Sequence, residues 1–362
     1  MFKIIGMTKL IWKLFKIVLT LLLAFLMYVV IGGVVPYLHH PDVSQTKKEA
    51  VESTQFYSDS AGPDRATIIE DNQEALKMRL RVIKDAKKTL ILSTFDFRSD
   101  DAGKDVLAAL LNAADRGVKV EIFADGFNSI IQMENNDYFY ALSSNKNIKI
   151  IIYNQVNILI PWNGLGRMHD KYVIADDSLY ILGGRNTFGY FLGDYAGHKN
   201  YDRDVLVYNT GSKDSSIYQI KDYYKKITSQ ECCSVFHYNE SLGEKNSVKK
   251  AEQELKNRYE SLENKYDKFL AENYDYKANT YETNKINLLS NPTSLYAKQP
   301  TVYYGLMYLA KNAKKEVKIH TPYIICNDYM YNELKNIKVP TTIMTNSAEN
   351  NGNIFGAVDY LN

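Results

Sequence analysis

A histidine and a lysine lie two residues apart in the stretch MHDKYVIADDSLYILGGRN, residues 168–186. The residues around them predict two short strands joined by a turn at 176–178. Because side chains on a strand alternate between its faces, His169 and Lys171 should project from the same face. The hairpin should also bring Asn186 alongside the pair.

These residue types suit chemistry at phosphorus. A neutral imidazole is a nucleophile, the lysine supplies a positive charge for phosphate oxygens, and the Asn amide adds a hydrogen-bond donor. The lysine should also lower the pKa of the imidazole and keep it unprotonated. We expect no metal and no cofactor, because an ammonium group is a poor neighbour for a cation and no ligand cluster has metal spacing. Alone, such a triplet is more often part of a solvated strand face.

The elements before the pair predict an α/β unit. Apolar residues from Leu76 to Ile83 have helical spacing, and TLILSTFDF at 89–97 is typical of a strand. A second helix is predicted over 101–117, with Gly117 at its end, and a second strand at 118–126. A helix–strand–helix–strand order favours parallel strands with both faces of the sheet covered.

Part of this unit recurs later in the chain. VIKDAKKTLILSTFDF at 82–97 is similar to YLAKNAKKEVKIHTPYI at 308–324, and both place Ala-Lys-Lys between a helix and a strand. A helix-like segment at 327–337 and a strand-like segment at 340–347 follow. The chain is therefore predicted to hold one whole copy of the unit and the start of a second. Chance similarity between two βα units is the alternative.

The N-terminus predicts a membrane anchor. Residues 17–35 carry no charge, and their length is close to the ~20 residues that cross a bilayer as a helix. Lysines precede this run at positions 3, 9, 13 and 16, so the positive-inside rule favours a single-pass protein of the cell membrane. The N-terminus should be cytoplasmic and the body should lie on the outer face. A cleaved signal peptide is the rival interpretation.

The full spacing around the pair is H-x-K-x4-D-x6-G-G-x-N, given by His169, Lys171, Asp176, Gly183, Gly184 and Asn186. It resembles the signature of the phospholipase D superfamily. The motif stretch together with AADRGVKVEIFADGFNS, YDRDVLVYNTG and IMTNS is similar to bacterial cardiolipin synthases, from about residue 75 to the end.

The resemblance implies a fold and a mechanism. The fold would be a mixed or parallel sheet flanked by helices, in two pseudo-repeated halves that each carry one motif. One histidine would form a phosphohistidine intermediate while the other protonates the leaving alcohol. By this likeness His169, Lys171 and Asp176 are catalytic, and Lys171, Gly184 and Asn186 bind phosphate. Asp204 matches an acidic position of the family and would orient His169.

The domains then follow in order: an anchor at 1–36, a linker at 37–70, and a first phospholipase D-like half at 71–240. A charged amphipathic helical connector is expected at 241–285, where apolar residues recur at steps of four and three, and the start of a second half at 286–362.

The departure from the family is that His-x-Lys occurs once in 362 residues. The repeat offset of 227 would place a second motif at position 396, beyond Asn362. We therefore expect a truncated or dimer-dependent chain whose incomplete second half is less stable than an extended version. The second motif would come from a homodimer partner or from a missing C-terminal half.

Three readings of function remain open. The first is a membrane phosphatidyltransferase or phosphodiesterase that acts on a phosphatidylglycerol-like phospholipid. The second is a single-motif homodimeric nuclease, and the third is a catalytically inactive fragment. A net charge of +2 argues against a dedicated nucleic-acid partner.

Overall fold

The structure is a computed structural model that describes residues 2–237, 239–270 and 274–347. These residues divide into two units. The large unit comprises the chain up to His39, Phe56–Leu288 and Thr293–Ala297, and the small unit comprises the remaining segments from His40 onward. The predicted domain boundaries themselves stay a prediction.

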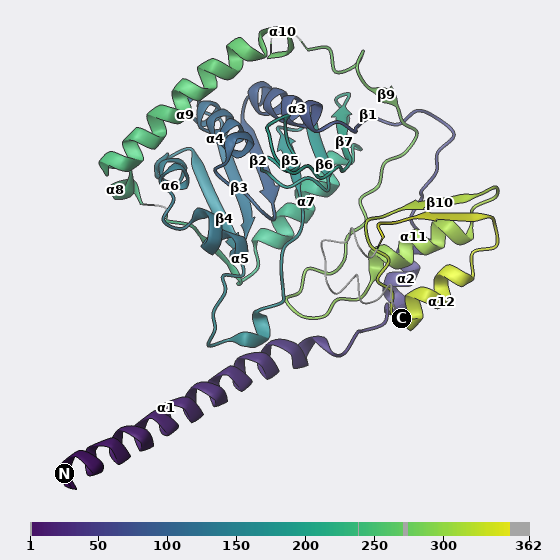
Figure 1. The fold of residues 1–362 in the computed structure, drawn as a ribbon. Helices are drawn as coiled ribbons and strands as arrows, with labels where there is room; N and C mark the ends of the chain where they lie inside the picture. The colour runs from purple at the N-terminus through teal and green to yellow at the C-terminus, as the bar shows by residue number, and fades with distance from the viewer. Residues whose placement is uncertain (1, 238, 271–273, 348–362) are drawn as a thin grey trace. The chain divides into compact units, whose positions relative to one another are not determined.

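Nine strands of the described chain form one mixed sheet in the large unit (Figure 1), in the order β8-β4-β3-β2-β5-β6-β7-β1-β9. Strands β2, β3 and β4 are parallel, and β5, β6, β7 and β1 continue the sheet with antiparallel pairing. The mixed sheet confirms the predicted fold class. The strands are β1 (Asp64–Ile69), β2 (Thr89–Thr94), β3 (Lys119–Asp125), β4 (Ile148–Tyr153), β5 (Tyr172–Ala175), β6 (Leu179–Gly183), β7 (Asp204–Asn209), β8 (Cys233–Val235) and β9 (Tyr281–Glu282).

Helices cover both faces of this sheet (Figure 1). One face packs under α3, α4 and α6, with α9 lying across α4 and α6, and the other packs against α7. On β2, Leu90 and Leu92 face the first core and Ile91 faces the second, as strand alternation requires. The helices are α3 (Asn72–Asp85), α4 (Asp101–Asp115), α6 (Asp137–Ser144), α7 (Ile217–Thr228) and α9 (Asn246–Lys265).

Local signals set where these helices begin and end. The Asp71 carboxylate accepts hydrogen bonds from the first turn of α3, and the Asp100 carboxylate accepts one from Gly103 N at the start of α4. Gly117 follows α4 with φ +93°, a conformation that favours glycine. The charged connector contains α9, whose apolar stripe buries Leu255, Tyr259 and Leu262.

Short elements complete the large unit. They are η1 (Val35–Tyr37), α5 (Gly126–Asn128), the π-helix η2 (Ser129–Met133), η3 (Pro161–Asn163), α8 (Glu240–Gly243) and α10 (Asp267–Leu270). Before them, α1 (Phe2–Val34) is the one helix among the described residues that is long and apolar enough to cross a bilayer, over Leu10–Tyr37. That finding concerns length and composition.

The small unit repeats the order of elements that the large unit uses. It contains α2 (Gln45–Glu52), α11 (Thr301–Lys311), β10 (Val317–His320), α12 (Asp328–Lys335) and β11 (Thr341–Met344). Strands β10 and β11 pair in parallel, as β2 and β3 do. Within this unit, Lys48 of α2 lies 5.8 Å from the centre of the Tyr304 ring on α11. The order helix–strand–helix–strand is the one that the sequence repeat predicts.

The segment predicted as a linker holds two regular elements, α2 and β1. Strand β1 has the sequence DRATII, whose first residues are polar, so no run of apolar residues marks it. Its pairing with β7, far along the chain, makes it a strand.

Candidate active site

The predicted pair forms a direct contact. Strand β5 begins at Tyr172, so His169 and Lys171 lie in the segment that leads into it rather than within the strand. The Lys171 ammonium donates to the His169 carbonyl oxygen at 2.6 Å, and its Nζ lies 3.1 Å from His169 Nδ1. Phe95 lies against both residues. The centroid of its ring is 4.6 Å from the centroid of the His169 imidazole and 5.5 Å from the Lys171 Nζ.

Lys171 is a buried cation that faces carboxylates. Only 4% of its surface is exposed, and this burial lowers its pKa to about 8. The charges of Asp170, Asp202 and Asp96 oppose the shift and favour the protonated form. At neutral pH Lys171 is therefore mostly protonated, and a small rise in pH removes its charge.

His169 is held in its neutral form. Partial burial, followed by the charge of Lys171, lowers its pKa to about 4. One side of the residue is nevertheless exposed to solvent, and solvent moderates such effects. The imidazole is unprotonated at neutral pH, as a nucleophile must be.

The contact with Lys171 also decides where the ring hydrogen lies. An ammonium group has no acceptor, so Lys171 donates to Nδ1 and the hydrogen of the neutral ring is on Nε2. Attack through Nε2 requires that hydrogen to leave. A phosphate that draws Lys171 away from Nδ1 would release Nδ1 to carry the hydrogen instead.

Asn186 lies where the end of β2 meets the end of the hairpin. Its Oδ1 accepts from Asp96 N at 3.1 Å, and Thr187 N donates to the Asp96 carbonyl oxygen at 3.0 Å. Because its oxygen is engaged, the NH₂ group of Asn186 is the part that can donate to a ligand. The Asp96 carboxylate accepts from Arg98 at 2.6 Å, which brings a second cation to this edge of the sheet.

Gly183 and Gly184 allow close packing of two chain segments. A Cβ on Gly183 would overlap the Asp204 carboxylate and lie 2.5 Å from the Arg203 carbonyl oxygen. A Cβ on Gly184 would overlap the Asp202 carboxylate instead. The N–H of Gly184, predicted to bind phosphate, donates to the Arg203 carbonyl oxygen at 3.3 Å. In this structure the glycine pair joins the end of β6 to the segment before β7.

Asp176 lies at the opposite end of β5 from the pair. The four residues of β5 lie between Lys171 and Asp176, so five steps of ~3.3 Å separate the two residues by about 16 Å along the chain. Its carboxylate accepts from the backbone N–H groups of Lys87, Lys88 and Thr89, each at 2.8 Å. The structure thus places Asp176 beside the connection between α3 and β2 and does not bring it to His169.

Asp204 forms a buried cluster with two arginines. Its Oδ2 accepts from Arg79 at 2.8 Å and from Arg185 at 3.1 Å. Burial alone would raise the pKa of Asp204, but the two guanidinium groups lower it below its usual value. Within the described residues its ion pairs run to these arginines and not to His169. The role predicted for Asp204 in orienting His169 stays a prediction.

Two neighbours of the pair were missed by the sequence reasoning. Asp202 stands two residues before Asp204 in the same Asp-Arg-Asp stretch, and its charge acts on Lys171 together with those of Asp170 and Asp96. Phe95 belongs to the predicted strand at 89–97, but an aromatic residue there is usually part of a core. The paired acids of Asp-Arg-Asp were the signal that could have indicated Asp202.

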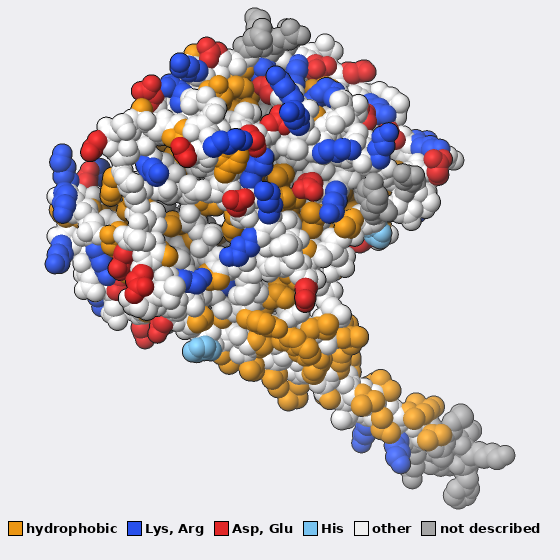
Figure 2. Space-filling model, turned by 180° about the vertical axis from the view of Figure 1, so that it is seen from behind, with side chains coloured by type: hydrophobic (Ala, Val, Ile, Leu, Met, Phe, Trp, Pro, Cys, Tyr) orange, Lys and Arg blue, Asp and Glu red, His pale blue; other side chains and the backbone are white. Residues whose placement is uncertain are grey.

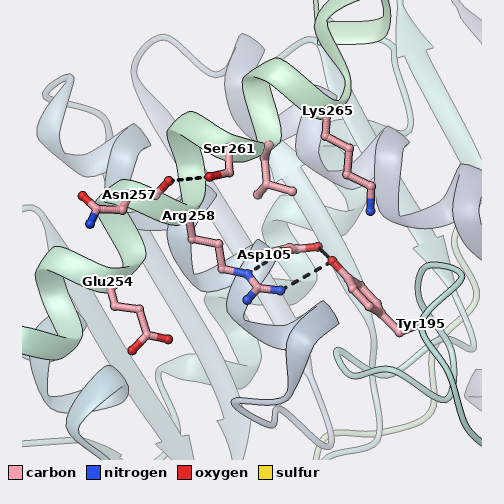
Figure 3. Close-up of a pocket in the computed structure, with 8 residues that line it drawn as sticks. Asp105, Tyr195, Glu254, Asn257, Arg258, Ser261 and Lys265 are labelled. Atoms are coloured by element: carbon pink, nitrogen blue, oxygen red, sulfur yellow. Dashed lines mark hydrogen bonds and ion pairs between the residues drawn. The ribbon is translucent and has the colours of Figure 1, made fainter.

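A polar pocket on α4 and α9 holds a separate cluster of charges (Figure 3). Arg258 Nε donates to Asp105 Oδ1 at 2.6 Å, and the Tyr195 hydroxyl also donates to the Asp105 carboxylate. Burial raises the pKa of Asp105 despite these partners. No motif residue lines this pocket. Its ion pair ties α9 to α4.

Part of the chain is similar in sequence to known proteins. Residues 80–227 match the family described as "Cardiolipin synthase, PLD-like domain". An uncharacterized protein of Helicobacter pylori is 27% identical over 309 residues, which cover 78% of this chain and 59% of that protein. Cardiolipin synthase B of Salmonella typhi is 31% identical over 142 residues, covering 39% of this chain and 34% of that protein. The chain thus matches well under two thirds of the length of these curated relatives.

A solved structure supports the fold. The phosphatidylserine synthase of Haemophilus influenzae aligns with 87% of this chain and 71% of its own, with a TM-score of 0.53 and 13% sequence identity. At this identity the likeness concerns the fold. Residues 80–227 match a phospholipase D-like domain, and this match relates the chain to the phospholipase D superfamily.

Proposed function

We propose that the chain is a membrane-anchored enzyme of the phospholipase D type, which transfers or hydrolyses phospholipid headgroups through a phosphohistidine. The observation that carries this proposal is the contact between a neutral, partly exposed imidazole and a buried lysine, Lys171 Nζ to His169 Nδ1. The match to a cardiolipin synthase domain supports phosphodiester chemistry. The apolar helix α1 would keep the enzyme at its lipid substrate.

The first chemical step is attack of His169 Nε2 on phosphorus. A nitrogen–phosphorus bond forms and the bond from phosphorus to the leaving alcohol oxygen breaks. Lys171 turns from Nδ1 to a non-bridging phosphate oxygen, and the Asn186 NH₂ group donates to another. The ring hydrogen passes from Nε2 to Nδ1 through water at the exposed edge of the imidazole. Water or an acceptor alcohol then attacks phosphorus and releases His169.

The leaving alcohol needs a proton, which in the family comes from a second histidine motif. His-x-Lys occurs once in these 362 residues, so we propose that the second motif comes from outside them: either from His169 of a second copy across a two-fold interface, or from further C-terminal sequence. Mixed dimers test this proposal. With equal amounts of native chain and His169→Ala chain, activity should fall to about a quarter when both copies must contribute, and to half when each site works alone.

We also propose that the N-terminus is cytoplasmic and that the body lies on the outer face of the cell membrane. The lysines before the uncharged run support this orientation, because Lys47 and Lys48 after it are partly offset by Asp42 and Glu49. Protease added to intact spheroplasts should digest the body. Protection of the body until the membrane is opened would reverse the orientation.

The decisive experiment is turnover by the full chain in phosphatidylglycerol vesicles, with single-stranded DNA as a parallel substrate. His169→Ala should abolish lipid turnover and the covalent phosphoenzyme. His198→Ala is the matched control, because His198 is an exposed histidine outside the motif, bonded to Asn200 at 2.9 Å. Both variants should keep the native thermal midpoint, since neither side chain is packed in the core.

The outcomes separate the readings. Cleavage of DNA with no lipid turnover would favour a nuclease and refute the lipid proposal. A folded protein with no turnover of either substrate, alone or as a dimer, would show that the chain is not catalytic by itself. Loss of activity in His198→Ala as well would mean that the motif is not the site.

A further inference from the structure

The connection between β4 and the motif exposes apolar side chains beside α1. Within residues 157–166, Ile158, Leu159, Trp162 and Leu165 are exposed, with Leu159 at 64%. Hydrophobic side chains gather along α1 and on the part of the body next to it (Figure 2). An exposed apolar patch of this kind marks a contact surface.

Specific contacts fix this connection to the end of α1. The Tyr28 hydroxyl donates to the Leu159 carbonyl oxygen at 2.8 Å, and the Tyr28 and Trp162 rings meet edge to face at 6.5 Å. The Tyr37 hydroxyl donates to the Trp162 carbonyl oxygen at 3.1 Å. A Cβ on Gly32 would lie 2.6 Å from Pro161 Cγ, so the helix and the connection touch closely there.

These contacts place the connection at membrane depth. Tyr28 lies seven residues before the end of the uncharged run at Val35, which is about 10 Å along a helix. If the uncharged run of α1 lies in the bilayer, whatever contacts Tyr28 lies in the same layer. Tyr and Trp side chains are typical of the boundary between headgroups and acyl chains, because each has an apolar body and a polar tip.

The backbone of the connection is suited to that boundary. Irregular backbone does not face lipid within the hydrocarbon layer, where each unsatisfied polar group is costly, so the boundary with the headgroups is the layer open to this connection. Here Ile160 N donates to the Asn157 carbonyl oxygen at 3.0 Å, Leu159 N donates to the Asn157 side chain at 2.9 Å, and Gly164 N donates to the Pro161 carbonyl oxygen at 2.9 Å. The hydroxyl groups of Tyr28 on α1 and Tyr37 on η1 contact two more carbonyl groups of the connection, those of Leu159 and Trp162.

We propose that residues 157–166 are a second membrane contact, which inserts Ile158, Leu159, Trp162 and Leu165 into the interfacial layer of the bilayer that α1 crosses. This inference rests on the proposed membrane anchorage, and it names the lipid surface as the partner. Insertion by about 5–10 Å is usual for interfacial elements.

The connection is also tied rigidly to the motif that follows it. Asn154 at the end of β4 donates to the Gly166 carbonyl oxygen at 2.8 Å, and the buried Asp125 carboxylate accepts from Met168 N at 2.9 Å. Arg167 donates to the Asn154 carbonyl oxygen at 2.7 Å. His169 comes three residues after Gly166, so a connection seated in the interface would hold the catalytic pair at the lipid headgroups.

Tryptophan fluorescence of the full chain in vesicles tests this directly. The chain has two tryptophans, so Trp12→Phe leaves Trp162 as the single reporter. In a Trp12→Phe, Trp162→Phe background, Leu159→Trp reports on the connection. Ile68→Trp in the same background is the matched control, because Ile68 is 63% exposed and lies on β1, toward the other edge of the sheet.

Brominated lipids should quench emission from positions 162 and 159, and aqueous iodide should leave it largely unchanged. The Ile68→Trp reporter should show the reverse. The proposal would be overturned if iodide quenched the Leu159→Trp reporter as strongly as the Ile68→Trp reporter. Quenching of Trp162 by brominated lipids would not rescue it, because Trp162 also contacts α1. Protection from both quenchers would indicate a protein partner and also overturn it. These fluorescence measurements need no turnover, so their outcome is independent of whether the proposed activity is found.

Discussion

Replacing Asp176 separates a positioning role from a catalytic one. Asp176→Ala removes the acceptor for the N–H groups of Lys87, Lys88 and Thr89, at about 1 kcal/mol each. It also puts alanine at φ +53°, which costs about 1 kcal/mol more. The sum is about 4 kcal/mol, or roughly 8–16 °C in thermal midpoint for a domain of this size. Asp176→Asn keeps one acceptor oxygen and tolerates this φ, so it should cost about 1–2 kcal/mol.

The assay is thermal unfolding in detergent micelles by near-ultraviolet circular dichroism, together with kcat/KM far below the midpoint. Asp177→Ala is the control, because Asp177 is an exposed neighbour that pairs with Lys221, and its loss should change stability by less than about 1 kcal/mol. We expect Asp176 variants to lose stability and keep kcat/KM. A native midpoint with lost turnover would refute the reasoning and make the carboxylate part of the chemistry.

The remaining predictions concern the pair, the glycines and metal. Because His169 must be neutral and Lys171 protonated, kcat/KM should fall as pH drops through about 4 and fall again as pH rises through about 8. Lys171→Arg should remove the alkaline fall from whatever activity remains, since arginine stays charged; an unchanged profile would contradict this. Gly183→Ala should lower the thermal midpoint more than Gly184→Ala. A Cβ at position 183 meets the Arg203 backbone and the Asp204 side chain, whereas a Cβ at position 184 meets the Asp202 side chain. Equal losses in thermal midpoint would argue against this reasoning. EDTA should leave turnover unchanged, because Lys171 supplies the positive charge; loss that a divalent ion restores would show otherwise.

The parts of the fold that follow local patterns could be predicted. The apolar stripe of α4, the apolar run of β2 and the hairpin of β5 and β6 are each visible within about fifteen residues of sequence. Strand β1 could not be predicted this way. Its sequence carries a weak signal, and its identity as a strand comes from pairing Asp64 with Asn209 across the chain.

The same division applies to the candidate site. The proximity of His169 and Lys171 was predicted from strand alternation, and the two residues are in contact although they lie just before β5 and not within it. Which carboxylate of Asp-Arg-Asp approaches Lys171 depends on the arginines that pair with Asp204, and Arg79 is more than a hundred residues away in sequence. Asp176 belongs to the motif by spacing, yet the length of β5 carries it to the other end of the strand.

The pairing of β1 with β7 has a consequence for synthesis. The partner of Asp64 is Asn209, and the turn that closes the sheet there has Ser215 and Ser216 donating to the Asp64 carboxylate at 2.5 and 2.9 Å. A ribosome adds about 5–20 residues per second, so roughly 7–30 s pass between the emergence of these two strands. During that interval β1 lacks both of its strand partners, β7 and β9, so we expect the nascent chain to need protection of this strand from other unpaired edges until β7 has been made.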